Sequence, residues 1–256
     1  MLKIKFLGTG TSQGVPVIAC PCEVCHSIDN HDKRLRASAL IEVNAKNILI
    51  DAGPDFRQQL LRENITHLDA ILITHEHKDH IGGLDDVRAI NYVTGNPIDI
   101  YAEKRVVNAI KSDYAYAFAD IRYPGVPEMN LHEIDGSMFT VAGNIVVTPI
   151  RVMHMKLPIY GFRIGKLTYI TDANYISDSE MEKIKGSEVL VINALRHEEH
   201  LSHFTLSEAL EVAAKVRAKT TYITHISHQL GFYDEVEKQL SLNVHLAYDG
   251  LSVTID

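Results

Sequence analysis

Tryptophan is absent from these 256 residues, and cysteine occurs only three times. Cys20, Cys22 and Cys25 all lie in the segment ACPCEVC. An odd number of clustered thiols in a cytoplasmic protein favours metal thiolates over disulfides, and zinc prefers four such ligands. The segment therefore predicts a zinc site that lacks one ligand of its own.

Apolar runs of the roughly 20 residues that a transmembrane helix needs are also missing. The opening residues, MLKIKFLGTG, alternate like a strand and lack the apolar stretch and cleavage site of a signal peptide. We therefore expect a cytoplasmic location and no membrane partner.

Positive charge is scarce, with 25 Lys and Arg against 33 Asp and Glu and a formal net charge of −8. This balance does not favour a broad surface for polyanions, so we expect a small ligand and no long nucleic acid. Low-complexity tracts, repeats and long linkers are absent too, while 46% hydrophobic residues suffice for a sizeable core. We predict a single domain over residues 1–256.

Apolar periodicity predicts both strands and helices. The expected strands are 2–8, 38–44, 47–51, 69–74, 98–102, 139–143, 144–152, 160–165, 166–172, 188–194, 220–226 and 244–250. The expected helices are 54–64, about 83–92, 103–112, 177–185, 205–218 and 233–240. Some strands pair as hairpins and others alternate with helices. The pattern predicts the α/β class, with two mixed β-sheets flanked by helices in an αββα sandwich.

The segment ITHEHKDH, residues 73–80, follows a buried apolar run. If the chain stays extended there, His75, His77 and Asp79 face a common point, and His80 approaches it from the turn at DHIGG. Imidazoles and a carboxylate suit Zn²⁺, Mn²⁺ or Fe²⁺, and four donors are enough to share between two ions. A solvated polar loop would explain one histidine but explains this pattern poorly.

Four more strand-like runs end in a residue of the same type, namely Asp51, His154, Asp172 and His225. A single aspartate or histidine at a strand end is usually a turn or surface residue. Four of them, together with residues 75–80, predict one metal centre.

The order of these residues resembles the five motifs of the metallo-β-lactamase superfamily, and the resemblance covers nearly the whole chain. It implies two metal-binding groups, His75, His77 and His154 for one ion and Asp79, His80 and His225 for the other. Asp172 would bridge both ions. Asp51 would orient the site from behind the ligands, as metal-binding histidines require.

The opening FLGTGTSQGVPVIACPCEVC resembles the phosphodiesterase branch, in particular the phosphoribosyl 1,2-cyclic phosphate phosphodiesterases. In that family a C-x-C-x-x-C cluster binds a structural zinc together with a histidine three residues after the last catalytic one. The resemblance implies a zinc-binding loop at about residues 9–37, with His228 of THISH as the fourth ligand. His26 is a rival, but it adjoins Cys25, where a shared tetrahedron is harder to close.

The resemblance also implies chemistry. Two catalytic divalent metals, Mn or Zn, would hold a bridging hydroxide that attacks phosphorus in line. The leaving alkoxide needs a proton, and His203 precedes a T-x-x-E capping box, Thr205 and Glu208, that opens a helix. Related phosphodiesterases have a histidine here as their proposed general acid. We count Asp79 and Asp51 with His203 as catalytic residues.

Other histidines carry less information. His197 and His200 compete with His203 but lack an H-E-x-x-H spacing, so we interpret them as loop residues. No pattern supports the remaining ones, which we expect at the surface or satisfied in the core: His31, His67, His132 and His245.

The leading hypothesis is hydrolysis of a small, cyclic ribose phosphodiester. The tRNA 3′-processing endonucleases share FLGTG and H-x-H-x-D-H, but residues 155–171 leave no room for their RNA-gripping arm. A thioester or lactone hydrolase, a protein related to pyrroloquinoline quinone synthesis, and a non-catalytic metal-stabilised binding module are further alternatives. The segment 113–127 is expected to cap the site, to form a homodimer surface or to supply an aromatic core strip.

Overall fold

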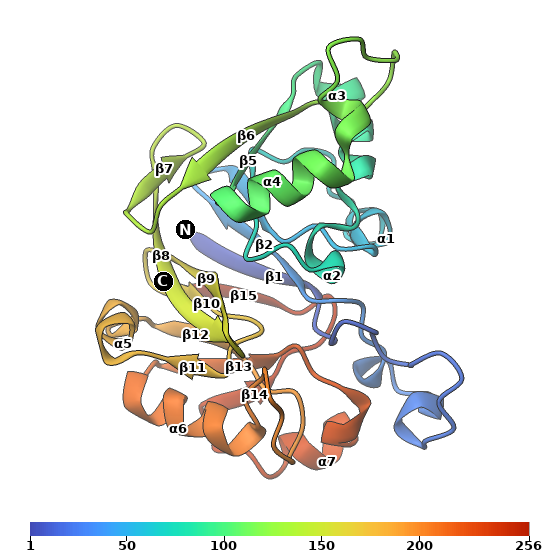
Figure 1. The fold of residues 1–256 in the computed structure, drawn as a ribbon. Helices are drawn as coiled ribbons and strands as arrows, with labels where there is room; N and C mark the ends of the chain where they lie inside the picture. The colour runs from blue at the N-terminus through green and yellow to red at the C-terminus, as the bar shows by residue number, and fades with distance from the viewer. Residues whose placement is uncertain (256) are drawn as a thin grey trace.

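Two β-sheets lie face to face in the computed structural model, which describes residues 1–255 (Figure 1). The first has the order β15-β1-β2-β3-β4-β5-β6. Its strands are β1 Leu2–Gly8, β2 Ser38–Val43, β3 Lys46–Ile50, β4 Ala70–Leu72, β5 Ile98–Glu103, β6 Met129–Ile134 and β15 Ser252–Ile255.

The second sheet has the order β11-β8-β9-β10-β12-β13-β14, and β7 pairs with β8 beside this path. Its strands are β7 Phe139–Val141, β8 Ile145–His154, β9 Leu157–Ile164, β10 Leu167–Tyr169, β11 Tyr175–Ile176, β12 Val189–Asn193, β13 Thr220–Thr224 and β14 Val244–Leu246.

Helices cover the outer face of each sheet (Figure 1). On the first sheet lie α1 Phe56–Arg62, α3 Val87–Thr94 and α4 Lys104–Asp113, and on the second lie α5 Asp178–Ile184, α6 Leu206–Val216 and α7 Tyr233–Glu237. A third apolar cluster fills the space between the sheets. The predicted αββα sandwich is therefore confirmed.

The strand directions determine where a site can form. Strands β3 to β6 run parallel to one another, as do β10, β12, β13 and β14. Carboxyl ends of parallel strands collect at one edge of a sheet, which is where open α/β sheets bind ligands. Residues 51, 172 and 225 follow β3, β10 and β13 at such edges.

Several short elements escaped the sequence analysis. The helical turn α2, Lys78–Ile81, replaces the extended chain that we predicted through Asp79, and that prediction is wrong. Strands β6, β11 and β15 were also missed, because they are only two to six residues long and bury only one or two residues each. The 3₁₀ turns are η1 Val24–His26, η2 Asn30–Asp32, η3 Leu84–Asp86, η4 Ala115–Ala117 and η5 His228–Leu230.

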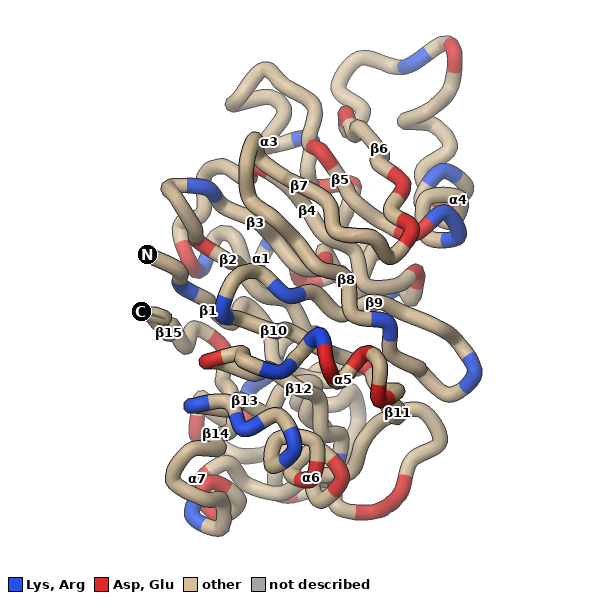
Figure 2. Tube along the Cα trace, turned by 90° about the vertical axis from the view of Figure 1, so that its left-hand side faces the viewer, with Lys and Arg blue, Asp and Glu red and all other residues tan. Residues whose placement is uncertain are grey.

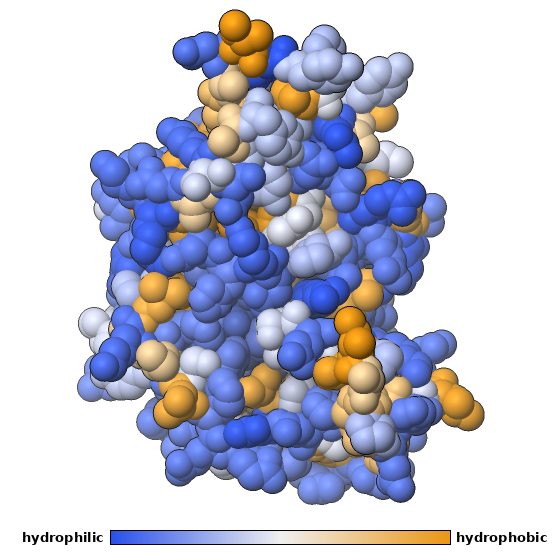
Figure 3. Space-filling model, turned by 45° about the vertical axis from the view of Figure 1, so that its right-hand side comes forward, coloured by the Kyte–Doolittle hydropathy of each residue, from blue (hydrophilic) through white to orange (hydrophobic). Residues whose placement is uncertain are grey.

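The segment 113–127 has an inner and an outer part. Tyr114 is buried, and its hydroxyl donates to the carbonyl oxygen of Ile81 at 2.7 Å. Beyond η4 the chain projects from the body, where Ile121 and Tyr123 are exposed. Figure 3 shows hydrophobic atoms at this upper end of the molecule. The inner part thus packs behind α2, as an aromatic core strip would.

No helix within residues 1–255 is both long and apolar enough to cross a membrane.

Candidate metal centres

Because the helical turn α2 begins at Lys78, the potential ligands of residues 75–80 point in two different directions. His75 and His77 lie on the extended chain before it, and Asp79 and His80 lie on the turn itself. The turn packs against the segment DAGPDF, where a Cβ at Gly53 would lie only 1.9 Å from the carbonyl oxygen of Asp79. Only glycine permits this approach, which fixes the position of Asp79 and His80.

The structure brings together the residues that the resemblance implied, in two adjoining groups. The ligand atoms within each lie at most 4.8 Å apart, in the groups His75, His77, His154 and Asp79, His80, Asp172, His225. Asp172 also lies within that distance of His154 and His203. We call these seven potential ligands the His/Asp cluster, and Asp172 lies where its two groups adjoin.

Backbone conformation at three strand ends aims side chains at this cluster. Asp51, Asp172 and His225 have φ angles of 62°, 59° and 55°, in the left-handed region. A non-glycine residue there costs about 1–2 kcal/mol, and aspartate tolerates it better than most. The sequence shows which residues end the strands, but it does not show this turn of the backbone.

The cluster attracts a cation. Burial raises the pKa of Asp172, but the neighbouring His225 and His80 outweigh it and hold that pKa well below its usual range. Burial lowers the pKa of His225, and the Asp172 carboxylate outweighs it, raising the pKa to about 9. The carboxylate of Asp172 therefore stays ionised among the histidines, as a ligand of a divalent metal must.

Buried ring nitrogens show that the cluster fits metal ions. Nε2 of His80 and both ring nitrogens of His225 are buried and have no hydrogen-bond partner. His225 Nε2 lies 3.0 Å from Asp172 Oδ1, but the two atoms do not have hydrogen-bond geometry. Nitrogens that converge without bonding to one another fit divalent metals, which imidazole and carboxylate ligate.

Hydrogen bonds behind the ligands orient them. Asp51 is fully buried, and its Oδ2 lies 2.7 Å from His80 Nδ1. The Thr74 amide donates to Asp51 Oδ1 at 2.8 Å, and the Thr74 hydroxyl donates to Oδ2 at 2.9 Å. His154 Nδ1 donates to the carbonyl oxygen of Asp172 at 2.7 Å. Asp51 therefore lies behind the ligands, and Thr74, which the sequence analysis missed, holds it there.

His203 adjoins the cluster directly. Its Nε2 lies 3.1 Å from Asp172 Oδ1, and its Nδ1 lies 2.9 Å from the Ser202 hydroxyl. Burial lowers its pKa to about 4, against the opposing effect of Asp172. The predicted capping box of Thr205 and Glu208 is confirmed at the start of α6, two residues farther on.

The two competing histidines lie farther out. His200 is exposed, and its Nδ1 lies 3.1 Å from Nδ1 of His203. His197 is also exposed and lies 3.0 Å from the carbonyl oxygen of Leu230. Neither belongs to a group of potential ligands within the described residues.

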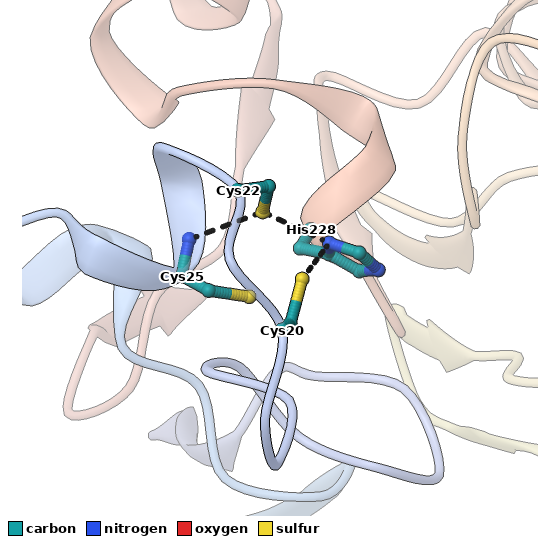
Figure 4. A group of neighbouring side chains, drawn as sticks. All are labelled: Cys20, Cys22, Cys25 and His228. Carbon is teal, nitrogen blue, oxygen red and sulfur yellow. Dashed lines mark hydrogen bonds between the residues drawn. The ribbon is translucent and has the colours of Figure 1, made fainter.

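The three cysteines form a second group with His228, which we call the Cys/His cluster (Figure 4). His228 Nδ1 lies 3.1 Å from Cys22 Sγ and 3.5 Å from Cys20 Sγ. His228 lowers the pKa of Cys22 to about 6, which favours the thiolate that zinc binds, while burial raises that of Cys25 to about 11. The rival His26 is exposed and turns to the carbonyl oxygen of Cys22 instead.

Comparison with known proteins agrees with this geometry. Residues 46–226 match the Beta-lactamase superfamily domain. The structure described as a new diphosphatase from the PhnP family is 40% identical, with a TM-score of 0.93 over 100% of this chain and 98% of that one. The Zn²⁺-bound PqqB of Methylobacterium extorquens, 18% identical with a TM-score of 0.80 over 99% and 100% of the chains, shares the fold.

A second relative is described by a different activity. An octanoyltransferase of Porphyromonas gingivalis strain W83 is 42% identical over all of this chain and 52% of its own length. The chain therefore spans about half the length of this relative. The two sheets, the flanking helices and the groups of potential histidine and aspartate ligands in this chain are those of a metal-dependent hydrolase of the superfamily. The chain belongs to the beta-lactamase superfamily and, within it, to the PhnP family.

Proposed function

We propose that this chain hydrolyses small phosphoric diesters with two divalent metals, Mn or Zn, in the His/Asp cluster. A structural zinc would occupy the Cys/His cluster. The observation that carries the proposal is the contact of His203 with Asp172, where both groups of ligands adjoin. A thioester hydrolase would need the metals but not a proton donor in this position, because a thiolate leaves more readily than an alkoxide.

In this proposal each ion has its own set of ligands, and one residue is shared. His75, His77 and His154 would hold one ion, Asp79, His80 and His225 the other, and Asp172 both. When bound, the two ions would supply a nucleophile near neutral pH and stabilise charge on the phosphoryl oxygens. Asp51 and Thr74 would keep His80 in the orientation and tautomer that a ligand requires.

His203 would protonate the oxygen of the leaving group. Its ring is held by Ser202 on one side and faces Asp172 on the other. A phosphate beside the ring brings negative charge, which favours the imidazolium that this role needs. The exposed side chain of His77 marks the side from which a small substrate would reach the cluster.

The leaving group distinguishes two substrate classes. We favour a cyclic ribose phosphodiester, because its sugar alkoxide departs poorly without a proton and His203 is placed to give one. The second candidate is a diphosphate bond, because the relative at 40% identity is described as a diphosphatase. Cleavage of a diphosphate releases a phosphate, which needs less help from an acid.

The octanoyltransferase name supports a weaker candidate, an octanoyl thioester. That relative is about twice as long as this chain, so the named activity can reside in the half that the chain does not match. We therefore keep octanoyl thioesters as one arm of the test.

Long nucleic acid is not the substrate that we propose. Basic and acidic positions are interspersed along the trace in Figure 2, and the net charge is −8. His154 and Asp172 are joined by the short β9 and β10 strands, with no inserted domain among these described residues.

A hydrolysis panel with Mn²⁺ or Zn²⁺ tests the proposal. Its arms are a cyclic ribose phosphate, 2′,3′-cyclic nucleotides, linear diesters, a diphosphate, a tRNA precursor, a lactone and octanoyl thioester. We expect the highest kcat/KM for a cyclic ribose phosphate. If only the thioester or only the diphosphate were hydrolysed, the phosphodiesterase proposal would be refuted, but the proposal of a catalytic metal centre would stand.

A further inference from the structure

Glu76 stands between two proposed ligands, His75 and His77, on extended chain. Because successive side chains there point to opposite sides, Glu76 turns away from the cluster. Its Oε1 contacts Nη1 of Arg105, in the first turn of α4. Its Oε2 is buried and has no hydrogen-bond partner, so Arg105 is the contact that the carboxylate depends on.

Arg105 also reaches the opposite sheet. Its Nη2 donates to the carbonyl oxygen of Pro158 at 2.8 Å. Pro158 lies in β9 and pairs with Met153 of β8, one residue before His154. A single guanidinium therefore bonds both to the segment that carries His75 and His77 and to the hairpin that carries His154.

A chain of charges extends this link along the junction of the sheets. Glu103, the last residue of β5, lies 3.4 Å from Nη2 of Arg105 and 3.0 Å from Nη2 of Arg151. Arg151 lies over the ring of Tyr160, 4.2 Å from its centroid. The backbone adds one bond nearby, from the Tyr160 amide to the Thr74 carbonyl oxygen at 3.2 Å.

We infer that Arg105 is a positioning residue that holds His75 and His77 at the correct distance from His154. The inference rests on the proposed function, in which these three histidines hold one ion. It predicts an unequal effect, because Arg105 contacts the segments of the first group, whereas in the other group Asp51 holds His80 and Gly53 packs against Asp79. Loss of Arg105 should weaken one metal site and spare the other.

An ordinary surface ion pair would behave differently. Arg105 is about one-third exposed, at 34%, and pairs at that exposure contribute little to stability. What Arg105 supplies is a planar fork of donors that reaches two elements at once, which lysine cannot reproduce. Metal affinity should therefore change much more than the melting temperature.

The test compares Arg105→Gln with Arg163→Gln. Arg163 of β9 also donates to main-chain carbonyls, those of Lys183 at 2.6 Å and Lys185 at 2.7 Å, and these bonds lie away from the cluster. Both proteins, with the structural zinc kept, are titrated with Co²⁺ and followed by visible absorption. Competition with a chelating dye then gives the two stepwise affinities.

We expect Arg105→Gln to weaken one of the two steps about 10–100-fold, the range for residues behind metal ligands, and Arg163→Gln to weaken neither. Glu76→Gln should weaken the same step less, because the bond to Pro158 remains. Two wild-type affinities in Arg105→Gln, or equal weakening of both steps, would overturn the inference, as would full recovery in Arg105→Lys. A wild-type protein that binds no Co²⁺ at this cluster would instead refute the proposed function.

Discussion

Each of the two clusters could hold metal, but they are built in different ways. The His/Asp cluster draws on both sheets, and five of its members, His75, His80, His154, Asp172 and His225, are buried. The Cys/His cluster takes three ligands from one loop and the fourth from η5, and only Cys25 is buried. Its loop also carries the strongly exposed Ile18 and Ile28.

This difference indicates which cluster needs its metal to keep its shape. Parallel strands, left-handed turns and the bonds of Asp51 and Thr74 place the His/Asp ligands before any ion binds. The hydrogen bonds of Cys20, Cys22 and Cys25 stay within their own loop or go to His228, and structural zinc sites contribute folding free energy. We therefore expect the first cluster to lose activity and the second to lose stability when a ligand is removed.

The largest effect should come from Asp172→Asn. Several kcal/mol of transition-state stabilisation depend on two correctly held ions, so we expect kcat/KM to fall roughly 10⁴-fold or more. The melting temperature of metal-free protein should change little in comparison. Kinetics, elemental analysis and thermal unfolding measure the three quantities.

Elemental analysis of the wild-type protein is the control for this experiment. We expect two catalytic metals and one structural zinc in each chain. Fully active protein with a single metal ion would contradict both the assignment of Asp172 and the contrast between the clusters.

The second effect depends on the leaving group. His203→Ala should slow hydrolysis of a cyclic ribose phosphate about 10²–10⁴-fold, because a sugar alkoxide needs a proton. Bis(p-nitrophenyl) phosphate should slow much less, since nitrophenolate leaves unaided, and metal content should not change. His200→Ala is the matched control, because His200 is exposed and contacts His203, whereas His203 itself contacts Asp172. Equal slowing of both substrates would assign His203 to binding or positioning.

The sequence predicted which side chains come together better than it predicted the contacts that support them. Side-chain type and strand ends identify Asp172 and His225, because a metal requires those groups at those places. The supports depend on contacts between distant segments. Arg105 is 29 residues from Glu76, and no local pattern joins them. Likewise, the turn α2 follows from the packing of Gly53, which local propensity does not show.

The third effect separates the clusters by stability. Zinc at about 100 times its dissociation constant contributes about 2.7 kcal/mol, which corresponds to roughly 5–10 °C in Tm for a domain of this size. Cys22→Ser should lose most of that increment together with the structural zinc, and activity should fall only indirectly. His26→Ala, an exposed neighbour outside the cluster, is the matched control. Wild-type zinc content and Tm in Cys22→Ser would show that the loop holds its shape without zinc.

The smallest effect concerns Tyr169, which lies between the sheets behind the His/Asp cluster. Its side chain is fully buried, burial raises its pKa, and its hydroxyl lies near Thr224 without hydrogen-bond geometry. An unsatisfied buried hydroxyl costs about 1–3 kcal/mol, so Tyr169→Phe should leave Tm unchanged or slightly higher. Metal affinity and turnover should stay at wild-type values, unlike those of Asp51→Asn, which removes a group that bonds to His80. A clear loss of metal affinity in Tyr169→Phe would mean that the hydroxyl supports the cluster, and that the supports of the His/Asp cluster extend into the core between the sheets.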